Sequence, residues 1–247
     1  MSEETDPRGI DVVVGAGSGI GGALVQRWQE HGRRPVLAVA RPESIAPLSE
    51  REDVLTHACD YGDEALESLG ARLMSEGSDI ARLVICNGVL QGEGYRPERA
   101  LSQLSGDAMR RVFEVNAFLP MRILAALSPA LKRSSEPRIA VLSARVGSIG
   151  DNRLGGWYSY RASKSALNMM LKCAALELRR MNPRAKLIAY HPGTVDTPLS
   201  KPFQSSVRES TLLSATSAAE ALDHVLDAAL VDGELSYLDW RGDTIPW

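Results

Sequence analysis

Short apolar runs recur along the chain, and segments whose apolar residues have helical spacing separate them. The runs are rich in Val, Ile, Leu and Ala, which is typical of strands buried on both faces. The predicted strands cover residues 10–14, 35–40, 54–59, 82–86, 137–142, 185–190 and 235–239. The predicted helices cover 23–28, 64–74, 107–132, 158–178 and 217–230. This alternation is typical of one parallel, doubly wound α/β sheet with helices on both faces, so we expect a single domain over residues 1–247.

The predicted helix over 107–132 contains two residues that a regular helix disfavours. Asn116 lies near its middle and has poor helix propensity, and Pro120 lacks the N–H that the helix ladder needs. A proline inside a helix is a common cause of a kink. Both residues are unusual for a helix that serves packing alone, so Asn116 is a candidate functional residue.

A glycine-rich segment follows the first predicted strand. Gly15, Gly19 and Gly21 have the spacing G-x-x-x-G-x-G, and helical spacing begins behind them. Glycines between a strand and a helix let the backbone turn tightly and approach a pyrophosphate, which rests on the helix N-terminus. We therefore predict a dinucleotide site that also includes Ser18 and Ile20; the alternative is a flexible turn without a ligand.

The ends of the second and fourth predicted strands add to this site. The second strand ends at Arg41, where dinucleotide-binding folds that prefer NAD place an acidic residue on the adenosine ribose. An arginine can pair with a 2′-phosphate instead, so the sequence favours NADP over NAD; the alternative is an arginine that faces solvent. After the fourth strand, Asn87 and Gly88 are small residues that suit close approach of a ligand to the backbone.

Tyr160 and Lys164 lie four residues apart near the start of the predicted helix over 158–178. Side chains at this spacing lie one above the other on the same helix face. An ammonium near a phenol favours the phenolate, so Lys164 is expected to lower the pKa of Tyr160 and make it a general acid or base near neutral pH. The alternative for an isolated pair is a surface tyrosine and a solvated lysine.

The composition of the chain limits the kinds of partner and compartment that we expect. The chain has 28 Lys and Arg against 31 Asp and Glu, a net charge of −3, which gives no general attraction to nucleic acid or an anionic membrane. Cys59, Cys86 and Cys173 each lie in an apolar run without C-x-x-C spacing, so we expect buried thiols in a reducing compartment. The acidic residues show no metal-site spacing, and no apolar run approaches the ~18 residues of a membrane span. Residues 1–8 are unlike a signal peptide, and we expect a cytoplasmic protein without a metal.

Together these residues resemble the short-chain dehydrogenase/reductase family over essentially the whole chain. The glycine turn matches the family's cofactor turn, Tyr160 and Lys164 match its acid/base pair, and Asn116 falls where the family holds a proton-relay water. The resemblance implies a Rossmann-like fold and an oxidoreductase that transfers hydride between NADP(H) and a carbonyl or secondary alcohol. The cofactor contacts that it implies, besides the glycine turn, Arg41, Tyr160 and Lys164, are Asp60, Tyr61, Asn87, Gly88, Pro192, Gly193, Val195 and Thr197.

Within the family, the chain is similar to the carbonyl-reductase branch that includes sniffer-type and C-factor-type proteins. The segments that carry this similarity are Gly147-Ser148-Ile149, Gly155-Gly156, residues 158–168 and Ile245-Pro246-Trp247. The cofactor turn departs from the family at Val14, where a threonine is usual, and the segment after the fourth strand is shortened. Neither departure removes the expectation of cofactor binding.

The most important departure of this chain from the family concerns the catalytic serine. When the family's S-x-x-G is aligned on Gly147, Ala144 stands at that serine. Ser143 is one residue too early, and its side chain is expected to point to the other face. Ser148 lies 12 residues before Tyr160, close to the family's usual separation, and its loop could carry the hydroxyl into the same space. Three alternatives stay open: Ser148 acts, Ser143 acts, or Tyr160 and Lys164 act at a reduced rate without either.

Two function hypotheses follow. In the first, Tyr160 gives a proton to the developing alkoxide, Lys164 also holds the nicotinamide ribose, and Asn116 holds a water that connects Lys164 to solvent. In the second, the chain is an NAD(P)-binding sensor or signalling protein with little or no turnover, which the absent serine and the C-factor resemblance favour.

The remaining expectations concern the surroundings of the site. Residues 199–214 lack clear periodicity and are expected to be a substrate-side lid that orders on binding. His191 has no second histidine or carboxylate at ligand or triad spacing, so we expect it to be structural. The family resemblance implies a homodimer or homotetramer and a small-molecule carbonyl substrate, which the sequence does not specify further.

Overall fold

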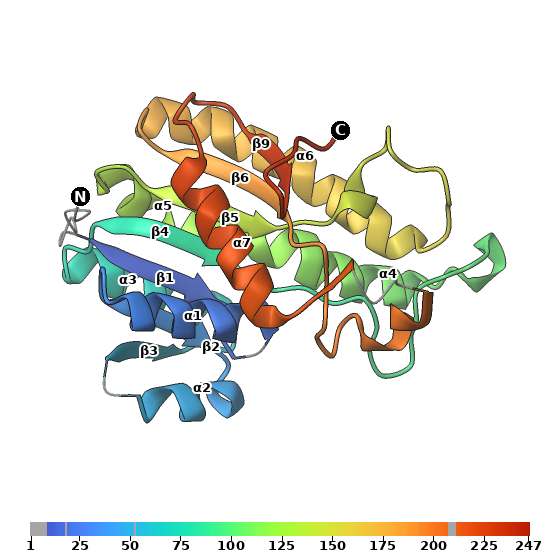
Figure 1. Ribbon diagram of the computed structural model, residues 1–247, viewed down its shortest axis with the longest axis horizontal. Helices are drawn as coiled ribbons and strands as arrows, with labels where there is room; N and C mark the ends of the chain where they lie inside the picture. The colour runs from blue at the N-terminus through green and yellow to red at the C-terminus, as the bar shows by residue number, and fades with distance from the viewer. Residues whose placement is uncertain (1–8, 18, 52, 207–210) are drawn as a thin grey trace.

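Seven parallel strands form one twisted sheet in the computed structural model (Figure 1). The structure describes residues 9–17, 19–51, 53–206 and 211–247. The order across the sheet is β3-β2-β1-β4-β5-β6-β9. The strands are β1 (Ile10–Val14), β2 (Val36–Ala40), β3 (Val54–Ala58), β4 (Ile80–Ile85), β5 (Arg138–Leu142), β6 (Lys186–His191) and β9 (Ser236–Asp239). The predicted fold class and all seven predicted strands are confirmed. Because the strand order reverses between β1 and β4, a crevice for a ligand is expected at the carboxyl ends of these two strands.

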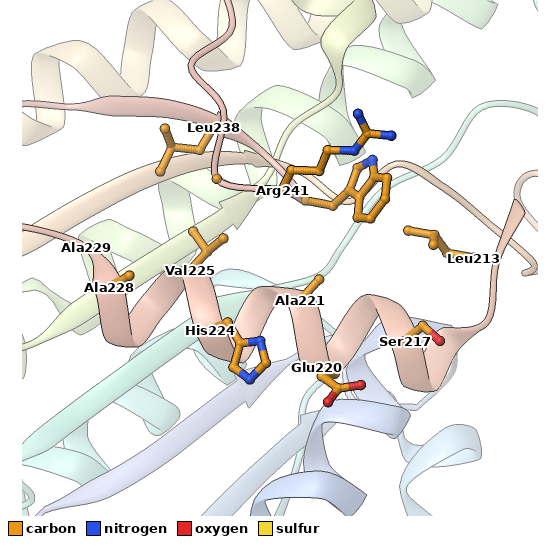
Figure 2. Close-up of a pocket in the computed structure, with 12 residues that line it drawn as sticks. Leu213, Ser217, Glu220, Ala221, His224, Val225, Ala228, Ala229, Leu238 and Arg241 are labelled. Atoms are coloured by element: carbon orange, nitrogen blue, oxygen red, sulfur yellow. The ribbon is translucent and has the colours of Figure 1, made fainter. Parts of the chain in front are cut away.

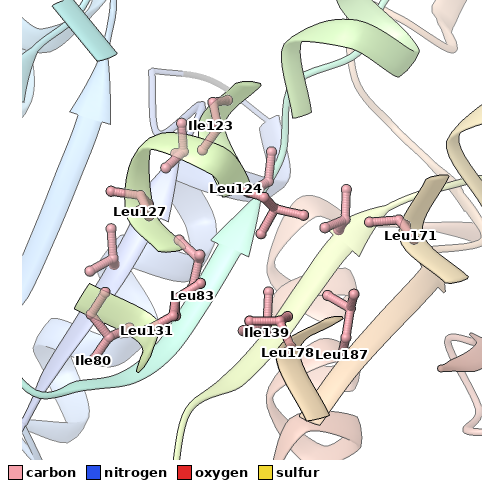
Figure 3. Close-up of a cluster of buried hydrophobic side chains, with 14 of the residues drawn as sticks. Ile80, Leu83, Ile123, Leu124, Leu127, Leu131, Ile139, Leu171, Leu178 and Leu187 are labelled. Carbon is pink, nitrogen blue, oxygen red and sulfur yellow. The ribbon is translucent and has the colours of Figure 1, made fainter. Parts of the chain in front are cut away.

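One hydrophobic core lies between the sheet and three helices, α3 (Asp63–Ser75), α5 (Leu119–Arg133) and α6 (Tyr158–Met181). Figure 3 shows leucines and isoleucines of α5 and α6 meeting side chains of β4, β5 and β6 on this face. A second core on the other face is covered by α1 (Gly19–His31), α2 (Pro42–Ser49) and α7 (Ala215–Ala228). All five residues of β1 and of β2 are buried, because helices cover both faces of these strands.

The helix predicted over 107–132 consists of three consecutive pieces. α4 (Gly106–Phe113) passes into a π-helical turn, η2 (Glu114–Phe118), and then into α5. The interruption predicted around Asn116 is confirmed, but its cause is the π-turn. Pro120 lies in the first turn of α5, where a missing N–H costs little.

The continuous helical run over 106–133 is, by length and composition alone, long and apolar enough to cross a membrane. This corrects the expectation that no run approaches that limit. The run also supplies core residues, among them Ile123, Leu127 and Leu131, which contact the sheet. Packing against the sheet accounts for its apolar character.

Two further predictions need correction, those on helix α2 and on the cysteines. Helix α2 was not predicted, because its eight residues include Pro42 and Pro47, and prolines read as loop. In the predicted lid, η4 (Lys201–Ser206) is a 3₁₀ helix and β8 (Leu212–Leu213) pairs with β7 (Thr194–Val195), while residues 207–210 lie outside the described residues, and the lid stays a prediction. Cys59 is buried as expected, whereas Cys86 is only partly buried and Cys173 is exposed on α6.

Candidate active site

The glycine turn after β1 has the tight geometry that its spacing predicts. Gly15 and Gly19 have φ values of +86° and +54°, in the left-handed region that favours glycine. A Cβ atom on Gly21 would lie 2.3 Å from the carbonyl oxygen of Gly15, so only glycine fits there. Helix α1 begins at Gly19, buries Ile20 and has no acidic residue in its first turn, which suits an anion at its N-terminus. Ser18 lies outside the described residues.

Segments that are far apart in the sequence meet at this turn. A Cβ atom on Gly15 would lie 3.2 Å from the backbone nitrogen of Asn87, at the end of β4. A Cβ atom on Gly19 would lie 3.1 Å from the Thr197 methyl group, in the loop after β6. The glycine turn, the end of β4 and the loop after β6 therefore converge at the crevice between β1 and β4.

The loop after β6 is fixed by side chains behind it. Gly193, which follows Pro192, has a φ of +78°, and a Cβ atom there would lie 2.9 Å from the Trp240 ring and 3.0 Å from Leu213. Val195 is buried and pairs with Leu213 across β7 and β8. These contacts hold the loop against the glycine turn.

The predicted adenosine contacts lie at the ends of β2 and β3. Arg41 is exposed, and its Nε lies 3.2 Å from Oε1 of Glu43 in the first turn of α2. Asp60 is exposed and its Oδ1 accepts a hydrogen bond of 2.8 Å from the Gly62 nitrogen. Tyr61 has a φ of +70°, which is uncommon for a residue with a side chain. Burial raises the pKa of Tyr61, although its hydroxyl group bonds to Asn87 and to the Gly15 backbone.

Asn116 is fully buried and joins two parts of the site. Its amide forms two hydrogen bonds of 2.8 Å to the backbone of Val89, one to the N–H and one to the C=O. Its Nδ2 also donates to Ser163 Oγ over 3.1 Å. Both N–H donors are used, while Oδ1 has a second lone pair with which it can accept a hydrogen bond. The π-turn thus directs Asn116 between the segment after β4 and helix α6.

Lys164 is buried beneath the same segment, with only 2% of its surface exposed. Its ammonium group donates a hydrogen bond of 2.8 Å to the Leu142 carbonyl at the end of β5. Burial lowers the pKa of Lys164 to about 7, because the charged form loses its hydration. A Cβ atom on Gly88 would lie 3.8 Å from Lys164 Nζ and 3.6 Å from Asn116 Oδ1, so the glycine leaves a cradle between these polar groups.

Tyr160 is half-buried one turn before Lys164 on α6. Burial raises the pKa of Tyr160 to about 12, and the neighbouring phenol of Tyr237 adds to the rise. This is opposite to the predicted direction, and the prediction that Lys164 lowers this pKa is corrected. The physical reason is that burial disfavours the charged phenolate, while the Lys164 ammonium group is directed to the Leu142 carbonyl.

Both candidate serines make hydrogen bonds within the protein, Ser143 as a donor and Ser148 as an acceptor. Ser143 Oγ donates to Asn168 Oδ1 on α6 over 2.6 Å. Ser148 Oγ accepts a hydrogen bond of 3.0 Å from the Asp151 nitrogen, which closes the turn after η3 (Arg145–Gly147). Within the part of the chain that the structure describes, neither hydroxyl hydrogen-bonds to Tyr160.

Two residues at this edge were not found from the sequence. Tyr237, on β9, donates a hydrogen bond of 2.6 Å from its hydroxyl to the carbonyl of Ala144 and stacks on Trp247, with ring centroids 5.1 Å apart. Glu98 is buried beside the start of α6, where its carboxylate accepts a hydrogen bond of 3.2 Å from the Ser159 nitrogen. No local pattern identifies either residue, because their partners lie more than 60 positions away in the chain.

His191 lies beside the cofactor loop and is neutral. Its Nδ1 is buried without a hydrogen-bond partner among the described residues. Burial, helped by the Arg145 charge, lowers the pKa of His191 to about 4. A histidine with that pKa is a poor proton donor near neutral pH, in keeping with the expected structural role.

A cavity of about 500 Å³ lies elsewhere, between α7 and the segment that follows β9 (Figure 2). None of the predicted site residues lines it, although Leu213 and Trp240 are shared with the wall behind Gly193. Its titratable side chains are Glu220, His224 and Arg241, and none of them belongs to the predicted site. Among the described residues, no group of three or more His, Cys, Asp and Glu side chains could hold a metal ion.

The residues present fit a dinucleotide. The glycine turn offers a helix N-terminus, the loop after β6 lies across it, and the Gly88 cradle opens beside Lys164 and Asn116. Residues 10–208 match the family described as short chain dehydrogenase. The chain belongs to this family. Its members are oxidoreductases with a nicotinamide cofactor, so the coarse functional expectation and the family resemblance are confirmed.

Individual relatives place the chain within this family. It is 31% identical over 148 residues to the C-signal protein of Myxococcus xanthus, covering 60% of this chain and 84% of that protein. It is also 31% identical over 193 residues to 1-hydroxy-2-glutathionyl-2-methyl-3-butene dehydrogenase of Rhodococcus sp. (strain AD45), covering 78% of this chain and 80% of the relative.

Solved structures share the fold over almost the whole chain. A short-chain dehydrogenase/reductase from Burkholderia multivorans with bound NADP has a TM-score of 0.81 and 27% identity, covering 98% of this chain and 100% of that one. The carbonyl reductase Sniffer of D. melanogaster has a TM-score of 0.81 at 19% identity, covering 98% of this chain and 100% of that one. At that identity the second likeness shows the fold alone.

Proposed function

We propose that the protein is an NADP(H)-dependent reductase of a small carbonyl compound, with Tyr160 as the proton donor. The observation that carries this proposal is the convergence of the glycine turn, the Gly88 cradle and Lys164 at the carboxyl ends of the strands. Tyr160 lies one helical turn from Lys164 at this edge. When bound there, the nicotinamide supplies the hydride; carbonyl, NADPH and one proton give alcohol and NADP⁺.

Tyr160 remains a competent general acid in the reducing direction despite its raised pKa, because an alkoxide is a far stronger base than a phenolate. With a pKa of about 12 the phenol is protonated near neutral pH and can donate a hydrogen bond, then a proton, to the developing alkoxide. Lys164, with a pKa of about 7, exchanges protons readily at that pH and can reload Tyr160. Asn116 Oδ1 faces the Gly88 cradle and would hold the connecting water, while Lys164 would also bind the nicotinamide ribose.

Of the three alternatives for the serine, the hydrogen bonds favour the third, in which neither Ser148 nor Ser143 acts. Ser143 gives its hydroxyl proton to Asn168, and Ala144 offers no donor. Ser148 Oγ accepts from the Asp151 nitrogen and makes no hydrogen bond to Tyr160 among the described residues. A single oxyanion donor contributes ~10² to 10³-fold to kcat in enzymes that have one. We therefore propose that turnover is slower than in relatives that keep the serine.

NADP is the preferred cofactor in this proposal. Arg41 stands exposed directly after β2, where it could pair with a 2′-phosphate, and the Burkholderia relative was crystallised with NADP. Glu43 competes for Arg41, so binding of NADP would exchange one ion pair for another. The adenine would lie beside Asp60 and Tyr61.

The proposal also covers the domain organisation, the location in the cell and the oligomeric state. Residues 1–247 would act as one domain in the cytoplasm, with 199–214 as the lid. Phe118 on η2 and Met169 and Leu176 on α6 are apolar and 46%, 66% and 41% exposed, as expected for helices that pair in a homodimer or homotetramer.

A sensor or signalling protein is the second candidate, favoured by Ala144 and by the similarity to C-signal, whose name denotes a signal. One experiment separates the two functions. Purified protein is mixed with NADPH and a panel of aldehydes, ketones and quinones, and the absorbance of NADPH is followed, while fluorescence titration measures NADPH and NADH affinity. The reductase proposal predicts turnover with at least one carbonyl and tighter binding of NADPH. Tight cofactor binding without turnover on any compound would support the sensor.

A further inference from the structure

Three aromatic rings meet beside the proton donor. The ring centroids of Trp157 and Tyr160 are 6.2 Å apart at an interplanar angle of 78°, and those of Trp157 and Phe203 are 5.2 Å apart at 63°. Both are edge-to-face contacts, which favour ring pairs through their quadrupoles. Trp157 and Tyr160 come from the start of α6 and Phe203 from η4, so the cluster spans two sides of the site.

The cluster serves neither hydrophobic core. Trp157, Tyr160 and Phe203 are half-buried and belong to neither of the two sets of core side chains that cover the sheet. Large aromatic side chains stabilise a fold mainly when they are buried. Packing of the core therefore does not explain why three rings gather next to Tyr160.

The backbone holds Trp157 in an unusual conformation. Its φ of 51° and ψ of 42° lie in the left-handed region, which is costly for a bulky residue, by ~1–3 kcal/mol. The Trp157 nitrogen donates a hydrogen bond of 2.5 Å to the Glu98 carbonyl, and its own carbonyl accepts the first bond of the helix from Arg161. The Glu98 carboxylate also binds the next turn through Ser159. Such strain persists only where surrounding contacts impose it, and it is common at ligand sites.

Phe203 is fixed to the cofactor loop on the other side. The Phe203 nitrogen donates to the Ser200 carbonyl over 2.8 Å, and the Lys201 nitrogen donates to the Thr197 carbonyl over 3.0 Å. Thr197 in turn lies against Gly19 of the glycine turn. Trp157 and Phe203, which contact each other, are therefore each tied to a different part of the site.

We propose that Trp157 and Phe203 form an aromatic wall beside Tyr160 that selects carbonyl substrates with a flat aromatic ring next to the C=O group. This inference rests on the proposed function, since it assigns the substrate class of the same site. The wall presents ring faces and edges and no charge, so a flat ring can stack on it while the carbonyl oxygen approaches the Tyr160 hydroxyl. Each aromatic pair contributes ~0.5–1.5 kcal/mol beyond the buried area, which corresponds to ~2 to 10-fold in affinity.

Two ketones of similar size test the wall: acetophenone, which has a flat ring, and cyclohexyl methyl ketone, which has a saturated one. Their binding to the protein loaded with NADP⁺, which cannot reduce a ketone, is measured by calorimetry. Their kcat/KM is measured with NADPH. We expect acetophenone to bind ~5 to 10-fold more tightly, and Trp157→Leu and Phe203→Leu each to remove most of this preference while the saturated ketone changes less than twofold.

The matched control is Leu154→Ala, a change at a 91% exposed side chain three positions before Trp157 that leaves all three rings in place. It should leave the preference unchanged. Equal affinity for the two ketones, equal losses for both in the Trp157 and Phe203 variants, or no binding of either ketone would overturn the wall. If acetophenone binds preferentially but NADPH is oxidised with neither ketone, the wall stands and the reductase proposal fails. If both ketones are reduced and bound equally, the reductase stands and the wall fails.

Discussion

Two buried clusters of charged groups lie at opposite ends of the sheet, and they are organised in opposite ways. Near the amino ends of β1 and β4, Arg82 is enclosed by carboxylates, 2.6 Å from Asp223 and 2.5 Å from Asp227. At the carboxyl ends, Lys164 is equally buried but donates to a backbone carbonyl, and no carboxylate among the described side chains pairs with it. In the first cluster carboxylates neutralise the charge of Arg82, whereas in the second no described carboxylate neutralises the charge of Lys164.

The pKa values of the two clusters reflect this difference. Burial alone would raise the pKa of Asp223, but hydrogen bonds from Trp28 and Arg27 and the charge of Arg82 lower it overall, so its carboxylate stays ionised. Burial without a compensating charge instead moves the pKa of Lys164 down to about 7 and that of Tyr160 up to about 12. Paired burial serves the fold, while unpaired burial brings the pKa of Lys164 to the neutral range, where it can exchange protons, and keeps Tyr160 protonated.

The largest effect is expected from breaking the paired cluster. Arg82→Met removes the partner that buried Asp223 and exposed Asp227 share, and because Asp223 keeps Arg27 and Trp28 it should lower the free energy of unfolding by ~3 kcal/mol. The measurement is urea denaturation of wild type and variant at pH 7. The double variant Arg82→Met, Asp223→Asn also removes the buried carboxylate that then keeps only Arg27 and Trp28 as partners, and it should recover part of the loss. A loss below ~1 kcal/mol would show that the cluster is not a stabilising pair.

Asp11 lies at the edge of the paired cluster. The pH dependence of the stability of wild type and an Asp11 variant tests the same idea. Burial raises the pKa of Asp11 from 3.8 to about 6, although the charges of Arg82 and Arg34 oppose the rise. The folded state then holds a proton that the unfolded state has lost, so this group's stabilisation falls as pH rises from ~4 to ~6, by up to ~3 kcal/mol. Asp11→Asn should flatten that part of the stability curve relative to wild type. Parallel curves for the two proteins would contradict the assignment.

Lys164 should show the opposite slope. Its folded pKa of about 7 lies below the ordinary 10.5, so the unfolded state binds more protons and stability rises with pH above 7. Between pH 7 and 8.5 the gain is ~2 kcal/mol, and Lys164→Met should abolish it. Chemical denaturation at the two pH values, without cofactor, measures the difference. A wild type that becomes no more stable relative to Lys164→Met over this range would show that the ammonium is solvated or paired.

The smallest effect is expected from a substitution at Ala144, which should raise the activity. Ala144→Ser places a hydroxyl where the family's serine stands, and it should raise kcat for carbonyl reduction ~10-fold while the affinity for NADPH stays unchanged. Ser148→Ala and Ser143→Ala are the controls, and each should lower kcat by less than ~3-fold, because their hydroxyl groups hold Asp151 and Asn168. A large loss of kcat in either control would restore that serine as the catalytic group.

The sequence predicted the fold closely because strand burial, glycine turns and helix spacing are local signals. The seven strands and helix α6 follow from apolar runs, and the positions of Gly15, Gly21 and Asn116 follow from residues that are unusual in their own segment. Helix α2 was missed because its two prolines imitate a loop.

What the sequence could not show depends on contacts between distant segments. The upward shift in the pKa of Tyr160 follows from burial, and burial is a property of the assembled site. Glu98 reaches Ser159, and Tyr237 reaches Ala144, across 61 and 93 positions, so no spacing rule connects them. The commitment of Ser143 to Asn168 is likewise visible only once β5 lies against α6.

The central claim is that Tyr160 donates the proton at a nicotinamide site. The most direct measurement is Tyr160→Phe, which removes one hydroxyl, with NADPH oxidation followed in a single turnover on a carbonyl that the wild type reduces. The account predicts that the rate falls at least ~10³-fold while the affinity for NADPH, from fluorescence titration, stays within a few fold. A variant that keeps its turnover would contradict the claim.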